Sequence, residues 1–103
     1  MRWTERRRTI SRMIAGAFSA RTSISMDDFT AIYLEQDPPP TIGDFEAQYI
    51  PDGETLETIL EELGEACGVD EEKIAAHYDR RESFARFAEH LLRIGALGGE
   101  EGQ

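Results

Sequence analysis

Apolar residues recur along this chain at intervals of three, four and seven, the spacing that places side chains on one face of an α-helix. The pattern predicts a first helix over about 4–20, whose apolar stripe consists of Trp3, Ile10, Met13, Ile14, Ala17 and Phe18. Two further stripes predict helices over about 54–67 and 79–94. No segment predicts a sheet convincingly, so the expected fold class is all-α.

A helix over about 25–34 is predicted because its first residue is a good N-cap. Ser25 can accept a hydrogen bond from the first turn, and Asp28 stands where its side chain can reach back. The run Asp-Pro-Pro-Pro at 37–40 removes three backbone donors, so it predicts a helix end followed by a stiff, extended spacer. The segment 41–52 is compatible with either a short helix or an extended segment laid across the core.

Start and stop signals also divide the second half of the chain. Gly68 is expected to end the helix over 54–67, and Asp70 to cap a short fourth helix. Asp79, followed three residues later by Glu82, predicts the start of the last helix. Two ion pairs with a spacing of four residues are expected on it, Glu82–Arg86 and Glu89–Arg93. The chain therefore predicts one compact domain of four to five helices over 1–97, with a flexible tail over 98–103.

Composition agrees with a small globular domain. The chain has 103 residues, of which 40% are hydrophobic, enough for one core without metal or disulfide support. Cys67 is the only cysteine, and no apolar run approaches the ~20 residues of a membrane span. We therefore expect a cytoplasmic protein that does not span a membrane. Residues 1–25 also have the composition of an organellar transit peptide, and we prefer an amphipathic first helix.

Charge is distributed unevenly along the chain. Residues 1–21 hold six arginines and one acid, a net charge of +5, and the other residues hold five bases and 20 acids, a net charge of −15. The whole chain carries −10. Such a division points to electrostatically steered association, either within the molecule or with a partner.

Acidic residues repeat every four positions on the helix predicted over 54–67. Glu57, Glu61 and Glu65 repel one another at this spacing, and no base lies on the same helix to relieve them. The ridge is open to three interpretations. It is a solvated or internally neutralised face, or a face that docks a basic protein or imitates the phosphates of nucleic acid. In the third interpretation the arginine-rich end contacts nucleic acid or an anionic membrane, and the ridge takes no part. The candidate partner-binding residues are Glu54, Glu57, Glu61, Glu62 and Glu65, and the candidate anion contacts are Arg6, Arg7, Arg8 and Arg12.

The segment from Leu63 to Ile74, LGEACGVDEEKI, resembles the helix-turn-helix family over about twenty residues. Gly64 takes the small-residue position of the first helix, and Ile74 would pack the second helix onto the first. The resemblance implies DNA binding through the exposed start of the second helix. This chain departs from the family there, since positions 70–72 are Asp-Glu-Glu, which a major groove would repel.

Catalytic and metal-binding motifs are not found. His77 and His90 are 13 residues apart with no companion at a metal-ligand spacing, and Cys67 lies on the apolar face of its helix. No phosphate-binding glycine loop or nucleophile elbow is present. We therefore expect no catalytic residues, no metal and no cofactor, and we do not expect an enzyme.

The function expected from the sequence is a small acidic interaction module, a regulatory, adaptor or inhibitor protein of the kind that phages and mobile elements encode. Its partner would be a basic protein surface, and self-association is a further alternative. Trp3, Phe45 and Tyr49 are candidate aromatic anchors if they are exposed. The alternative function is a helix-turn-helix-type DNA-binding regulator that uses the arginine-rich first helix.

Overall fold

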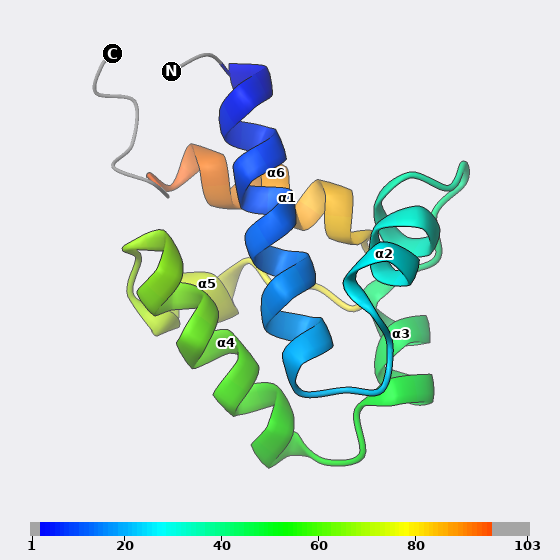
Figure 1. Cartoon of the computed structure of the whole chain (residues 1–103). Coiled ribbons are helices and arrows are strands. Elements are labelled where there is room, and N and C mark those ends of the chain that lie inside the picture. Colours follow the sequence, from blue (N-terminus) through cyan, green and yellow to red (C-terminus); the bar gives the residue numbers. More distant parts are fainter. Residues whose placement is uncertain (1–2, 96–103) are drawn as a thin grey trace.

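The computed structural model describes residues 3–95, and this part of the chain is all-α without a strand (Figure 1). Its elements in chain order are α1 (Trp3–Ala20), α2 (Met26–Phe29), the π-helical turn η1 (Thr30–Leu34), α3 (Ile42–Tyr49), α4 (Gly53–Cys67), α5 (Glu71–Ala76) and α6 (Phe84–Arg93). The predicted all-α fold class is confirmed. The predicted tail over 98–103 lies outside the described residues.

Helix α1 is the central element of the fold. It crosses in front of α6, runs beside α4 on one side and contacts α2 on the other (Figure 1). Helices α4 and α5 form a hairpin, and the turn η1 contacts α6. Because α1 has a different neighbour on each side, its arginines face different elements of the fold.

Four fully buried phenylalanines join the elements. Phe84 at the start of α6 lies 4.9 Å, centroid to centroid, from both Phe18 of α1 and Phe29 of α2. Phe45 of α3 lies 5.5 Å from Phe84, and Tyr33 of η1 extends the cluster. Because each ring comes from a different element, this cluster fixes the relative positions of α1, α2, α3 and α6.

Capping explains where several helices begin and end. Ser25 Oγ accepts a hydrogen bond from the Asp28 backbone N–H at 3.1 Å, as predicted. Gly68 ends α4 in the left-handed region, with φ of 73°, also as predicted. The segment left open by the sequence contains helix α3, which begins with a reciprocal capping box between Thr41 and Asp44, each hydrogen bond 3.1 Å long.

The predicted start of the last helix was wrong. Helix α6 begins at Phe84, and Ser83 Oγ caps it by accepting from the Arg86 backbone N–H at 3.2 Å. Asp79 instead closes a local turn, its Oδ1 accepting from the Arg81 backbone N–H at 2.9 Å. Asp70 occupies the N-cap position of α5 but its side chain makes no capping hydrogen bond.

The ion pairs expected on the last helix also differ. Glu82 binds the His90 ring at 3.0 Å in place of Arg86. Glu89 binds Arg86 at 3.4 Å and Arg7 of α1 at 3.5 Å. The later start of α6 accounts for the first difference, because Glu82 precedes the helix.

Two glycines allow a test of the packing between α4 and α5. A Cβ atom on Gly64 would lie 2.8 Å from the Val69 carbonyl oxygen, whereas one on Gly16 would meet nothing closer than Met26 Cε at 3.9 Å. Gly64→Ala should therefore lower the free energy of unfolding by about 1–2 kcal/mol. Gly16→Ala should raise it by roughly 0.5–1 kcal/mol through helix propensity. Urea denaturation of both variants measures the difference, and a stabilising Gly64→Ala would contradict the close approach.

Candidate functional site

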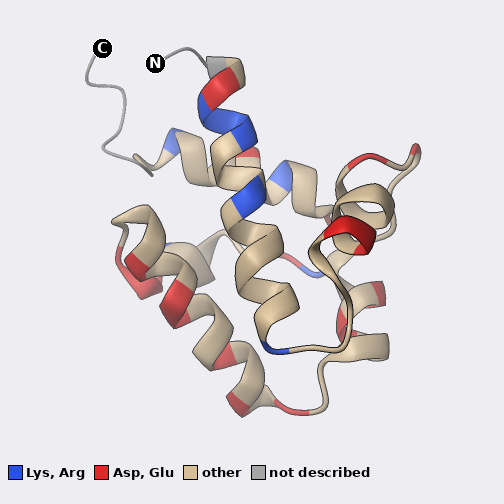
Figure 2. Cartoon of the chain, in the orientation of Figure 1, with Lys and Arg blue, Asp and Glu red and all other residues tan. Residues whose placement is uncertain are grey.

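An acidic strip runs along the solvent side of α4. We give this name to Glu54, Glu57, Glu61 and Glu65, which fall within about 80° of helix circumference and span about 16 Å of its axis. All four are exposed, and Figure 2 shows the acidic positions along α4. Within residues 3–95 none of these four carboxylates forms a hydrogen bond or ion pair. The strip is an uncompensated anionic surface.

Glu62 differs from the strip although the sequence grouped it with the same candidates. It turns toward α1, where its carboxylate pairs with the Arg21 guanidinium, Nε to Oε1 being 3.4 Å. This carboxylate raises the pKa of Arg21. Internal neutralisation between the first helix and α4 is therefore realised at this pair, and it leaves the strip itself untouched.

A shallow hollow of about 280 Å³ adjoins the C-terminal end of the strip. The residues that line it include four acids, Glu61, Glu65, Asp70 and Glu71, together with Gly64. Gly68 also lines the hollow, and a Cβ atom there would meet no atom within 4 Å, so the space beside the α4–α5 turn stays open. Four carboxylates around a small concave surface suit the guanidinium or ammonium group of a basic side chain.

The same turn is the segment that resembles a helix-turn-helix. Gly64 is buried against the Val69 backbone, and Ile74 is fully buried, as the resemblance implies. Helix α5 is only six residues long, however, and it begins with Glu71 and Glu72. The local packing matches the motif, while the exposed start of α5 is anionic.

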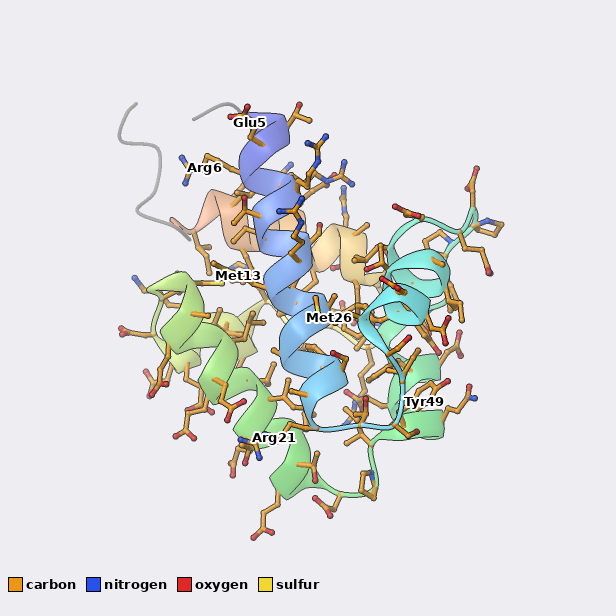
Figure 3. All side chains as sticks on the ribbon, viewed as in Figure 1. Glu5, Arg6, Met13, Arg21, Met26 and Tyr49 are labelled. Carbon is orange, nitrogen blue, oxygen red and sulfur yellow. The ribbon has the colours of Figure 1, made fainter. Side chains whose placement is uncertain are left out.

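The arginines of α1 do not form one surface. Arg7 pairs with Glu89 of α6 at 3.5 Å, and Arg6 is half-buried and points away from α2 (Figure 3). Arg8 and Arg12 are exposed and form no ion pair or hydrogen bond within residues 3–95. The structure thus leaves two of the four candidate anion contacts available in this part of the chain.

Arg8 and Arg12 form one wall of a groove between α1 and α2. This α1–α2 groove has a volume of about 570 Å³, and its opposite wall carries Asp27 and Glu35. Met26 and Leu34 contribute apolar surface to it. Arg7, which pairs with Glu89, also lines this groove.

Met26 is a surface residue that the hydrophobic pattern did not predict. It is 45% exposed, and Ile32 on η1 is 36% exposed. Met26 lies three and seven residues before Phe29 and Tyr33, so helical spacing alone assigns it to the buried face. Met26 Cε lies 3.9 Å from the position that a Cβ atom on Gly16 of α1 would occupy, so this side chain crosses the α1 surface at a glycine.

The candidate aromatic anchors are only partly accounted for. Phe45 is fully buried and cannot serve as an exposed anchor. Tyr49 is half-buried, with its ring 4.9 Å from Phe45. The side chain of Trp3 lies outside the described part of the structure.

The two histidines pack α5 against α6. Their rings are stacked with centroids 5.6 Å apart, and His90 Nε2 lies 3.0 Å from Glu82 Oε1. Both rings are half-buried. Among residues 3–95 no group of three histidine, cysteine or carboxylate side chains is placed to hold a metal ion.

Cys67 is a core residue, as its position on the apolar face predicted. It is 1% exposed, and its Sγ lies 3.8 Å from Met13 Sδ. Burial raises the pKa of the thiol to about 11. A thiol in this environment remains protonated at neutral pH and is a poor nucleophile.

Comparisons of this chain with protein-family models, with curated proteins and with solved structures found no match. Across residues 3–95, no helix has the length and apolar character needed to cross a membrane.

Proposed function

We propose that this protein is a small interaction module that binds a basic protein surface through α4. The observation that carries the proposal is the acidic strip: four exposed glutamates on one helical face that no cation of residues 3–95 neutralises. Like charges four residues apart cost a helix about 0.2–0.5 kcal/mol per pair. A cationic partner would remove this cost and gain charge-assisted hydrogen bonds.

The hollow beside the strip supports a protein partner. A lysine or arginine side chain entering it would meet carboxylates from both α4 and α5, namely those of Glu61, Glu65 and Glu71. Electrostatic complementarity of this kind mainly accelerates encounter and excludes wrong partners. The proposed role is therefore that of a regulatory, adaptor or inhibitor protein that recognises a basic surface.

DNA binding is the weaker alternative. The exposed start of α5 carries Glu71 and Glu72, and the arginine face of α1 is reduced because Arg7 pairs with Glu89. Asp27 and Glu35 also lie across the groove from Arg8 and Arg12. Phosphates approaching these arginines would meet acids nearby, which opposes the charge neutralisation that DNA binding requires.

Reversing the charge of the strip tests the proposal. In the triple variant Glu57→Lys/Glu61→Lys/Glu65→Lys, recovery of the partner from cells of the native host should fall at least about tenfold, because like charges then face each other across the contact. Affinity capture with quantitative mass spectrometry measures the recovery. Circular dichroism should show unchanged helicity, since all three positions are exposed.

A matched control separates the strip from overall charge. Glu5→Lys/Asp28→Lys/Asp37→Lys makes the same change in net charge at exposed positions outside both α4 and the α1–α2 groove. It should capture the partner as the unaltered protein does. Equal losses in both triple variants, or unchanged capture by the strip variant, would reject this binding surface.

A further inference from the structure

The α1–α2 groove matches the acidic strip in spacing as well as in charge. Arg8 and Arg12 stand one helical turn apart on α1, about 6 Å along its axis. Glu57 and Glu61 have the same separation on α4, and all four side chains are exposed without an ion-pair partner within residues 3–95. Two helices laid side by side could therefore form two arginine–glutamate pairs in register.

We propose that the α1–α2 groove of one copy of this protein receives the acidic strip of a second copy. The inference rests on the proposed function, since it names the basic surface that the strip binds. Met26, 45% exposed beside the arginine wall, would pack against the aliphatic stems of the incoming glutamates.

The second wall of the groove limits the strength of this contact. Asp27 and Glu35 face the arginines, so the groove is cationic on one side and anionic on the other. On the α4 side, Arg21 is already paired with Glu62 beside the strip. The strip would therefore bind through the arginine wall of the groove alone.

The resulting assembly is head to tail. The strip lies along α4 and the groove between α1 and α2, on different parts of the molecule (Figure 2). Where two copies form one such contact, the pair keeps one free groove and one free strip, so further copies can add. Exposed ion pairs contribute little to binding, and the net charge of −10 opposes association. The contact should be weak and salt-sensitive.

Sedimentation velocity of the whole chain tests the proposal at ~10 mM and ~1 M salt, where the Debye length is about 30 Å and 3 Å. At low salt the weight-average mass should rise with protein concentration past that of a dimer, and at high salt it should return to that of the monomer. Monomer throughout the low-salt series would overturn the inference. A mass that stops at the dimer would also overturn the head-to-tail arrangement, because it would mean that two copies engage both grooves and both strips reciprocally.

Two neutralised variants make the test specific. Arg8→Gln/Arg12→Gln removes the groove charge, and Glu57→Gln/Glu61→Gln removes the strip charge, so each alone should be monomeric. Mixed together, they retain one intact groove and one intact strip, and they should form a 1:1 dimer that does not grow. Arg86→Gln/Arg93→Gln, the matched change on α6, should assemble as the unaltered protein does.

The outcomes separate this inference from the proposed function. The strip variant carries less negative charge, so weaker repulsion between copies would by itself increase its association. A monomeric strip variant would therefore show that the strip is needed for the contact. Assembly that persists in either neutralised variant would overturn the head-to-tail contact. If the protein is monomeric but its host partner is still lost on strip reversal, the proposed function stands and this inference fails.

Discussion

Replacing Phe84 by alanine should lower the free energy of unfolding by about 3–5 kcal/mol. Phe84 is fully buried, and its ring contacts those of Phe18, Phe29 and Phe45 from three other elements. Truncation removes the shared partner of all three rings and leaves a cavity that several helices would have to move to fill. Small domains have only about 5–15 kcal/mol of stability in total, so this variant should be close to unfolded.

Urea denaturation followed by circular dichroism measures this effect. Arg86→Ala, at an exposed position on the same helix, is the control and should change stability by no more than about 0.5 kcal/mol. A loss below about 1 kcal/mol for Phe84→Ala would contradict the central position of this ring, because single core truncations of this size normally exceed it.

Phe84 also shows how far the sequence predicts the core. Phe84 lies on the buried face of α6 and Phe18 on that of α1, and helical spacing marks each of these faces locally. That these two rings meet depends on α1 crossing α6, and nothing in either stripe specifies this crossing. Periodicity identifies which side of a helix is buried, whereas the partner across the interface is set by the packing of all the elements.

The sequence left helix α3 undecided, and the predicted start of α6 was wrong. Thr41 and Asp44 form the capping box that begins α3, but the three prolines before them favour an extended chain. Asp79 and Glu82 have the spacing of a helix start, although no helix begins at Asp79. Backbone carbonyls of residues 80 and 82 accept from the N–H groups of residues 43 and 42, at 2.9 and 2.8 Å, which holds this segment against α3. Such a long-range constraint leaves no local trace.

Of the candidate surfaces, one follows from local spacing and the others depend on how the elements pack together. Spacing alone placed Glu57, Glu61 and Glu65 on one face of α4, since residues four apart are neighbours on a helix. The α1–α2 groove was not predictable, because Asp27 and Glu35 come to line the same groove as Arg8 only when α2 packs against α1. The hollow at the α4–α5 turn was not predictable either, because it depends on the path that the backbone takes after Gly68.

The thiol of Cys67 should react with a thiol reagent at pH 8 at least about 100-fold more slowly in the folded protein than in urea. An unperturbed cysteine has a pKa near 8.5, so about a quarter of it is thiolate at pH 8. Burial raises the pKa of Cys67 to about 11, which leaves about 0.1% as thiolate. The side chain is also only 1% exposed, so the thiol can react only when the structure around it opens transiently.

The same pKa shift predicts loss of stability in alkali. Because the folded state favours the neutral thiol, its contribution is fully present below pH ~8.5, and it is lost as the pH rises toward about 11. Tyr78, whose pKa is also raised by burial and by its hydrogen bond to Glu46, acts in the same direction. Cys67→Ala should therefore reduce the fall in stability over this window without abolishing it.

A folded protein whose thiol is modified as fast as that of the unfolded chain would show that Cys67 is accessible, and the packing of α4 on Met13 would have to be revised.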